Sequence, residues 1–450
     1  MKFQHYGDID IIFDGEGTLY LKNGKEYDVS FAIAKHNEKA LLFNLASESI
    51  DPFKALSLFG TKLNKLEGLD KKGRKIKATG LLSKDSTTDG DTNSITIVNG
   101  YVSECKIGEL NIESGFSVHF DLTNFLFLGN ETKIEQSDRG KRYSRSILKL
   151  SFDDFYCRIE KAENYSTVAQ LLKRQGGVLK TSTLIVQIDN YDDYKSSFEK
   201  VRKLCQLLSV ARSTFINWGS CKVFDTEGKV VYEFHGQAQS RNYHGNNLIK
   251  DLPNETVKFL KKAWIEYDQY KELLDLKRVI YGYIDTFQNS YVETRCLNIA
   301  ALTESICSRW AIHEKRYLFI DKTKFESQLP KLNNSIEKAL RKEFSNLNDS
   351  HKQIMLNKVT GFNRRPLDWK LKRLRKAFNC PITDEEISRF VELRDNLAHS
   401  SLFPENTDNT DAFLFMRHFL DRIILRILDY KGTYFDMEER KQTILQVKNS

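Results

Sequence analysis

The sequence is poor in the features that mark exported, membrane-bound and metal-stabilised proteins. Its seven cysteines stand singly, with no CxxC pair and no Cys/His cluster, which argues against a structural zinc site and against a disulfide framework. No run approaches the roughly 18 apolar residues that a membrane-spanning helix needs, and the first residues do not open like a signal peptide. These absences predict a cytoplasmic protein with no membrane partner, no bound metal and no cofactor.

The composition is otherwise that of an ordinary globular protein, with 40% apolar and 29% charged residues. A chain of 450 residues is too long for one hydrophobic core, so two or three domains are expected. The formal net charge of +8 permits a nucleic-acid partner but does not identify one, because binding depends on where the charge is clustered.

Residues 1–125 alternate apolar and polar side chains in the way that β-strands do. Asn23-Gly24 is a strong hairpin signal between two such runs, residues 18–21 and 27–33. The pattern predicts a β-rich N-terminal domain over residues 1–125.

Residues 126–250 mix strand-like runs with helical ones. Between Phe198 and Ala211 the apolar side chains keep a 3.6-residue period, which predicts a helix. The polar, turn-rich run of residues 237–247 is expected to be a linker. We therefore predict a mixed α/β second lobe, together with the linker, over residues 126–250.

From residue 251 onward the apolar period is helical, with long stripes over residues 255–288, 291–315 and 411–430. This pattern predicts an all-helical domain over residues 251–450. The expected fold class is thus α+β and multidomain, with a β-rich N-terminal half followed by an all-α helical bundle.

The sharpest anomaly is Arg394, near the end of an amphipathic helix whose start carries the capping-box pair Thr383 and Glu386. A rotation of about 100° per residue places Arg394 near the middle of the apolar stripe, and arginine is almost never fully buried without a partner. Arg394 therefore requires either a buried acidic partner or a second surface that brings anions to it. Glu304, on the apolar face of an upstream helix, is the internal candidate for that partner, as a structural contact at least as well as a catalytic one.

His399 lies five positions after Arg394, about 140° around a straight helix. The helix is expected to end at about His399, so that the imidazole can turn back, and Asp395 could orient the ring. A histidine that titrates near neutrality beside a guanidinium suits phosphodiester cleavage. The histidine moves a proton at a ribose hydroxyl, the arginine stabilises the charge on phosphorus, and no metal is required. Taken alone, these residue types favour a helix-end salt bridge with His399 as a cap.

The wider context resembles a known family. The Arg-Asp-x-Leu-x-His run of residues 394–399 sits on a late helix, is followed by another long apolar helix, and resembles the arginine–polar–spacer–histidine signature of HEPN domains. Residues 291–306 and 363–374 are similar to the helices that precede this motif in the ApeA-like branch of the family. The β-rich first half is similar in character, though in no diagnostic motif, to the domain that precedes the HEPN module in antiphage proteins.

This resemblance implies a metal-independent endoribonuclease in which Arg394 and His399 are catalytic. Asp395 is then the polar residue that follows the arginine, and Asn396 and Glu304 support the pair. The resemblance further implies a homodimer in which two motifs face each other across a shared cleft, with tRNA or another RNA as the substrate. It also implies a toxin-like role in abortive infection. Because a free ribonuclease would harm its own cell, we expect the N-terminal half to be the sensing or inhibitory part, with a phage-derived trigger as its possible partner.

The densest basic stretch of the chain lies just ahead of the motif helix, where cations alternate with Trp369, Leu371 and Leu374. Such a run is either a solvated helix face or an electrostatic guide for an RNA backbone. On the second interpretation, the RNA-binding residues are Arg364, Arg365, Lys370, Lys372 and Arg373.

Two rival functions stay open. Some HEPN proteins bind without cleaving, so the chain could instead be a non-catalytic HEPN-like module that binds RNA, a nucleotide or a protein. A purely structural interaction protein is the third interpretation. Cleavage of RNA in the presence of EDTA would distinguish the enzyme from both.

Overall fold

The structure is a computed structural model of the chain. It describes residues 10–36, 40–48, 50, 63–88, 95–112, 115–137, 140–236, 243, 245, 247–288, 291–344, 346–403, 407–439 and 441–445. Most of the predicted linker at residues 237–247 therefore lies outside the described residues. Contacts divide the chain into two compact units, Met1–Lys261 (unit 1) and Lys262–Ser450 (unit 2).

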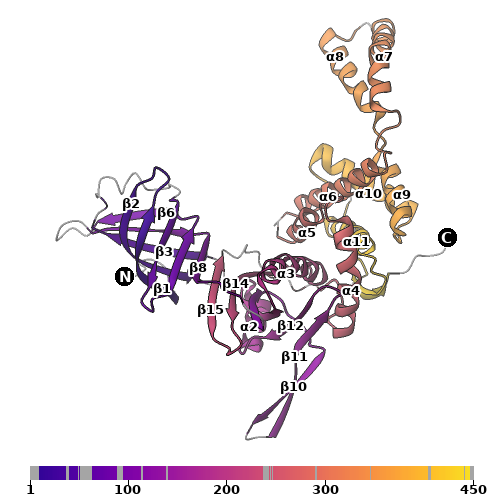
Figure 1. Ribbon diagram of the computed structural model, residues 1–450. Helices are drawn as coiled ribbons and strands as arrows, with labels where there is room; N and C mark the ends of the chain where they lie inside the picture. Colours follow the sequence, from indigo (N-terminus) through magenta and orange to yellow (C-terminus); the bar gives the residue numbers. More distant parts are fainter. Residues whose placement is uncertain are drawn as a thin grey trace. The chain divides into compact units, whose positions relative to one another are not determined.

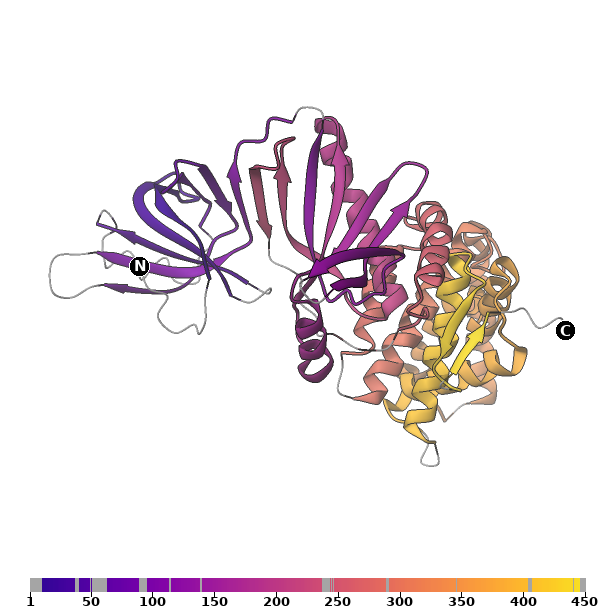
Figure 2. The ribbon, with the colours of Figure 1, turned by 90° about the horizontal axis from the view of Figure 1, so that it is seen from below.

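Unit 1 is built on one 15-stranded sheet whose neighbouring strands pair antiparallel (Figures 1 and 2). The strand order is β10-β11-β12-β13-β9-β14-β15-β8-β5-β4-β1-β2-β3-β7-β6. The strands are β1 (Asp10–Tyr20), β2 (Glu26–His36), β3 (Ala40–Ser47), β4 (Lys65–Asp70), β5 (Lys75–Thr79), β6 (Leu82–Thr88), β7 (Thr96–Val102), β8 (Glu104–Gly108), β9 (Phe116–Thr123), β10 (Glu131–Ser137), β11 (Gly140–Ser151), β12 (Tyr156–Lys161), β13 (Lys180–Ile188), β14 (Asn217–Phe224) and β15 (Val230–Gly236).

The predicted hairpin at Asn23-Gly24 is confirmed. β1 and β2 pair in antiparallel register as far as Tyr20↔Glu26. Gly24 has φ +81, a left-handed conformation that glycine adopts without a Cβ penalty. The turn fixes a register that sends alternate side chains inward, and those buried there include Leu19, Phe31 and Ile33.

The predicted helix around residues 198–211 is also confirmed, as part of α3 (Tyr191–Arg212). The side chain of Asn190 caps α3 by accepting a hydrogen bond from the Asp193 N–H at 2.9 Å. α3 packs against β13 and β14, and a shorter helix, α2 (Tyr165–Gln175), packs against β13. Along β9 the buried Phe116, Val118, Phe120 and Leu122 alternate with the half-buried Ser117, His119 and Asp121, so one face of this part of the sheet is apolar and the other polar.

The sheet of unit 1 is continuous across residue 125, where the sequence predicted a division. β9 pairs with β13 and β14, and β8 pairs with β5 and β15. Strands from both sides of that position therefore share one sheet.

A charged cluster with two buried carboxylates joins the β4–β5 turn to β15. Arg74 donates from Nε to Asp70 at 2.8 Å and from Nη1 to Glu233 at 2.9 Å. The contact with His235 and the surrounding cations lower the pKa of Glu233 to about 2. The ionised carboxylate is thus favoured by the fold, and its contribution to stability depends on pH.

Unit 2 is helical, so the predicted layout of a β-rich half followed by a helical half is confirmed (Figure 1). α4 (Pro253–Tyr270) crosses the boundary between the units. The elements that follow are α5 (Leu276–Asp285), α6 (Val292–His313), α7 (Lys322–Glu343), α8 (Asp349–Lys358), the 3-10 turn η2 (Val359–Asn363), α9 (Leu367–Phe378), α10 (Asp384–Ser400) and α11 (Asn409–Ile427). A two-stranded hairpin, β16 (Thr433–Asp436) and β17 (Lys441–Ile444), is an addition that the helical pattern did not predict (yellow in Figure 2).

α6 is the central helix of unit 2 and packs against α5, α9, α10 and α11. α11 is buried on all sides, including Arg417, which is 0% exposed. Arg417 donates from Nε to Asp421 at 2.9 Å and from Nη1 to the carbonyl of Tyr283 at 2.9 Å. The last long apolar helix of the sequence is therefore core of this chain.

α7 and α8 form a helical arm that extends away from the other helices of unit 2 (orange in Figure 1). α7 packs against α8 and η2, and Leu340 is its buried residue. Across the residues that the structure describes, no helix combines the length and apolar character needed to cross a bilayer.

Candidate active site

The helix that carries the Arg-Asp-x-Leu-x-His run begins as the sequence predicts. The Glu386 N–H donates to Thr383 Oγ1 at 3.2 Å, and the Thr383 N–H donates to Glu386 Oε2 at 2.6 Å, which completes a capping box. The other oxygen of Glu386 accepts from Arg422 of α11 at 2.7 Å. The start of α10 is therefore held in the bundle by polar contacts.

The apolar face of α10 is narrower than expected. Ile387, Phe390, Leu393 and Leu397 are its buried residues, and the Phe390 ring stacks on Phe419 of α11 with centroids 4.4 Å apart. In contrast, Val391 is half-buried and Ala398 is exposed. These two were expected on the apolar stripe, and their surface positions leave the last turn of α10 open on that side.

Arg394 is paired inside its own chain. Its Nη2 lies 2.6 Å from Glu304 Oε2 on α6, and its Nη1 lies 2.7 Å from Asp395 Oδ1. The hydrogen bonds to Asp395 and Glu304 raise the pKa of Arg394. The Glu304–Arg394 pair predicted from the sequence is present, and the Arg394 side chain nevertheless stays 29% exposed. Solvent, or a ligand, can therefore reach it.

A buried lysine lies beside this pair. Lys370 of α9 is 5% exposed, with Nζ 3.4 Å from Ser308 Oγ on α6 and 4.3 Å from the centroid of the Tyr317 ring. Burial lowers the pKa of Lys370, while the charge of Glu304 raises it. The site thus combines a guanidinium, two carboxylates and a buried amine from three helices, and Lys370 does not belong to the exposed basic surface on which the sequence placed it.

His399 is exposed on the last turn of α10. The helix continues to Ser400, and Ser401 caps it in a left-handed conformation. Five helical residues separate Arg394 from His399 by about 7.5 Å of rise and 140° of rotation, so a single chain does not bring them together. Within the described part of the chain no group bonds to the His399 ring, and Asp395 is turned toward Arg394.

Asn396 is half-buried. Its backbone carbonyl accepts a hydrogen bond from Ser400 Oγ at 2.6 Å. This contact supports the end of α10, and it places no polar group of Asn396 on either candidate catalytic residue.

The remaining predicted RNA-binding cations differ in whether they pack on aromatic rings or are exposed to solvent. Arg365 stacks on Trp369 at 4.2 Å and on Phe319 at 4.7 Å, measured from Cζ to the ring centroids. Arg373 lies over the Trp369 ring at 5.5 Å. The aromatic residues that alternate with the cations therefore hold two of them against the protein, and the exposed members are Arg364 and Lys372.

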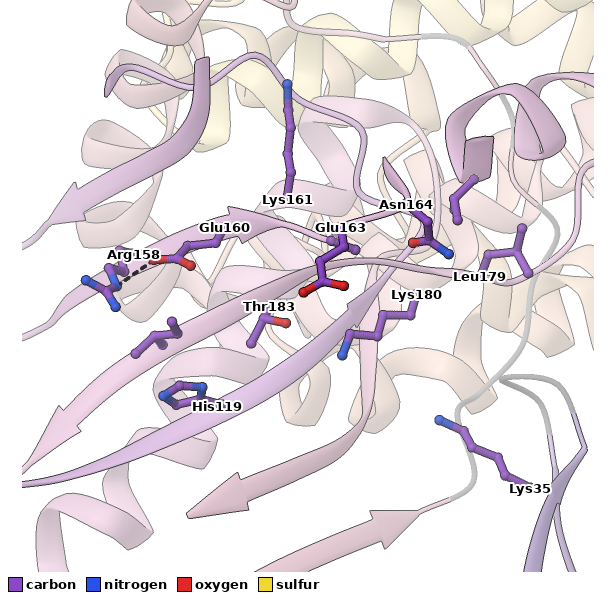
Figure 3. Close-up of a pocket in the computed structure, with 13 residues that line it drawn as sticks. Lys35, His119, Arg158, Glu160, Lys161, Glu163, Asn164, Leu179, Lys180 and Thr183 are labelled. Atoms are coloured by element: carbon purple, nitrogen blue, oxygen red, sulfur yellow. Dashed lines mark ion pairs between the residues drawn. The ribbon is translucent and has the colours of Figure 1, made fainter. Parts of the chain in front are cut away.

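A second polar site lies on the sheet of unit 1, where a cavity of about 950 Å³ opens over β9, β12 and β13 (Figure 3). Arg158 Nε lies 3.0 Å from Glu160 Oε1, and burial lowers the pKa of His119, which favours its neutral ring. The cavity wall therefore offers polar groups of both signs. Its residues come from strands far apart in the sequence, and no local signal identified it.

Among the described residues, no three His, Cys, Asp or Glu side chains lie together in a way that could hold a metal ion. The seven cysteines are all buried and unpaired.

No family model matches the chain, and searches of curated proteins and of solved structures found no similar protein.

Proposed function

We propose that this chain is a metal-independent endoribonuclease of the HEPN type that cleaves tRNA or another RNA in antiphage defence. The observation that carries the proposal is the position of Arg394. Its side chain stays 29% exposed at the edge of the buried face of α10, between buried Leu397 and exposed Ala398. An exposed histidine, His399, follows on the last turn of the same helix. Once one of its carboxylate partners is displaced, a guanidinium fixed at this position can stabilise an anion.

In the proposed reaction the ribose 2′-OH attacks the adjacent phosphate, and the bond to the 5′-oxygen breaks. The products are a 2′,3′-cyclic phosphate and a 5′-OH. Arg394 stabilises the charge that builds on phosphorus, and His399 transfers the proton. Because the two side chains diverge along α10, the proposed site is completed by a second copy of the chain, which supplies the facing motif.

The Glu304–Arg394 contact sets the condition for this chemistry. With two carboxylates on one guanidinium, the local charge opposes an incoming phosphate. We infer that the phosphate displaces one of the carboxylates. Lys370, which interacts electrostatically with Glu304, is placed to balance the charge of Glu304 when that happens.

The same pairing is the specific observation that favours a second candidate, a non-catalytic module. An arginine neutralised by Glu304 and Asp395 at 2.6 and 2.7 Å is equally suited to fasten α10 to α6. The chain would then bind RNA, a nucleotide or a protein without cleaving it.

The two candidates separate in one experiment. Purified full-length protein is incubated with tRNA in EDTA, and the products are tested for 2′,3′-cyclic phosphate ends. Arg394→Ala and His399→Ala are expected to abolish cleavage, whereas the matched changes Arg389→Ala, on the same helix, and His313→Ala, at the exposed end of α6, are expected to retain it. RNA binding without cyclic phosphate in any variant supports the module, and cleavage that survives Arg394→Ala contradicts the proposed enzyme.

We further propose that the enzyme acts as a cytoplasmic homodimer whose N-terminal half responds to a phage-derived trigger and restrains the nuclease until then. This follows from the proposed activity, because an unrestrained ribonuclease would damage its own cell. Sedimentation of the full-length protein at micromolar concentration tests the dimer, and a monomer there contradicts a shared cleft.

A further inference from the structure

The helix α7 carries a row of lysines at seven-residue spacing. Lys324, Lys331 and Lys338 are all exposed. Seven residues complete two helical turns to within about 20°, so on a regular helix the three lysines lie on one side and their Cα atoms span about 21 Å. We call these three residues the α7 lysine row. Pro330 lies inside α7 between the first two lysines and removes one helix hydrogen bond there.

The lysines of this row differ from the other cations of α7. Lys322 lies 3.8 Å from Glu326, and Arg341 lies 2.6 Å from Glu337. By contrast, the amines of Lys324, Lys331 and Lys338 form no ion pair with any residue that the structure describes. The charge that is left uncompensated on α7 is therefore concentrated in the row.

The α7 side chains on the same side of the helix as these lysines add hydrogen-bonding groups and no negative charge. Ser327, Gln328, Asn334 and Ser335 lie within about 60° of the row. The acidic residues of the helix lie at least about 120° around the helix from it, and they are Glu326, Glu337 and Glu343. Hydroxyl and amide groups are common partners of phosphate oxygens.

The surroundings of α7 make a purely structural role for this row weak. The arm of α7 and α8 extends from the bundle (Figure 1), and the row makes no ion pair that would fasten the arm. Three like charges about 10.5 Å apart along a helix are largely screened from one another at physiological salt, so the row neither fastens the arm nor costs it much stability.

We infer that the α7 lysine row binds the phosphate backbone of RNA, independently of base sequence. A regular series of unpaired amines with small polar residues beside them fits a chain of phosphates, because a phosphate backbone is bound through its charge and its regular spacing. It offers no aromatic or acidic groups for the recognition of bases. The choice of RNA as the polyanion rests on the proposed function.

The test compares two variants that lose the same charge. In the row variant Lys324, Lys331 and Lys338 are changed to Gln, a residue of similar helix propensity. In the control variant Lys271, Lys322 and Arg341 are changed to Gln, cations that already face carboxylates. Both are made in full-length protein carrying His399→Ala, so that RNA is not consumed, and binding of a labelled single-stranded RNA of about 20 nucleotides is measured from about 50 to about 200 mM salt.

Each phosphate contact contributes about −0.7 to the slope of log K against log salt for a single strand. Loss of three contacts should therefore make the slope shallower by about 2, so that the row variant loses roughly 20-fold less affinity than its parent over that salt range. The control variant should keep the parent slope. A further variant with Lys→Arg at the three positions should also keep it, because the charge is retained.

Equal slopes in the row variant and the control variant would overturn the inference, as would a parent protein whose RNA affinity is independent of salt. The proposed function is judged separately, by cyclic phosphate production in protein with His399 intact. A row-dependent slope in a protein that never cleaves RNA would overturn the nuclease and leave the α7 lysine row as an RNA-binding surface.

Discussion

Replacing Arg394 by alanine distinguishes a catalytic arginine from a structural one, because the two roles contribute very different free energies. The pairs that Arg394 makes are partly exposed, with side-chain exposures of 29%, 39% and 49% for Arg394, Glu304 and Asp395. Ion pairs of this kind stabilise a protein by about 1 kcal/mol or less. For a unit of the size of Lys262–Ser450, that loss lowers Tm by about 2–4 °C.

The catalytic role is much larger. Removing a group that stabilises transition-state charge should cost about 10²–10⁴ in rate, which corresponds to roughly 3–5 kcal/mol of transition-state free energy. The assay is single-turnover cleavage of tRNA in EDTA, with thermal unfolding of the same samples. Arg389→Ala is the control, since Arg389 lies on α10, is half exposed and pairs with Glu438 at 3.5 Å.

The expected result is therefore a small change of Tm in both variants and a large loss of rate in Arg394→Ala alone. Equal rates in the two variants would refute the catalytic role. A fall in Tm well beyond 4 °C in Arg394→Ala would contradict the small stabilisation assigned to its ion pairs. The loss of activity could then be due to unfolding.

Three further outcomes are expected. Glu304→Gln removes one carboxylate from Arg394 and should raise kcat/KM for RNA by about two- to fivefold, the equivalent of about 0.5–1 kcal/mol; a fall in kcat/KM would show that Glu304 orients the guanidinium. Arg417→Leu leaves a buried carboxylate without its partner and should lower the free energy of unfolding in urea by about 3–5 kcal/mol, whereas a neutral result would contradict the buried pair. Glu233→Gln should lower the free energy of unfolding by about 3 kcal/mol at pH 7, because contacts that include His235 hold the pKa of this carboxyl at about 2 against its ordinary value of 4.5. That contribution is present above pH 4.5 and is lost as pH falls toward 2, so the difference between wild type and variant should shrink over this window, and a difference that persists at low pH would contradict the assignment.

Local sequence patterns predicted the features that depend on near neighbours. The capping box of Thr383 and Glu386 needs residues three apart, and the hairpin at Asn23-Gly24 needs a turn that only a few residue types adopt. The Glu304–Arg394 pair could be predicted from the sequence for a different reason. Both residues break an apolar stripe, and each stripe shows which way its helix faces the core.

The environment of Lys370 could not be predicted in the same way. The basic run around it is a local signal, but its burial depends on Tyr317 and on Ser308 of α6, which are brought in by tertiary packing. The continuity of the sheet across residue 125 was hidden for the same reason. Which strands pair is decided by contacts far apart in the chain, and alternation within each strand carries no record of its neighbours.

The α7 lysine row shows the opposite case. Its spacing is visible in the sequence. A lysine every seven residues indicates no binding surface, however, until the positions of the acidic residues that could pair with it are known. Only the placement of Glu326 and Glu337 on other sides of the helix distinguishes an uncompensated row from an ordinary solvated face.

The central position of β9 has a consequence for biosynthesis. This strand ends at Thr123, but its two neighbours, β13 and β14, begin at Lys180 and Asn217. At about 5–20 residues per second on the ribosome, the second neighbour is complete roughly 5–20 s after β9 has been made. Until β13 has been made, the apolar side chains Val118, Phe120 and Leu122 of β9 lie on a strand open at both edges, and until β14 is complete one edge stays open. Nascent chains that stop within this span should therefore be the ones that depend most on chaperones.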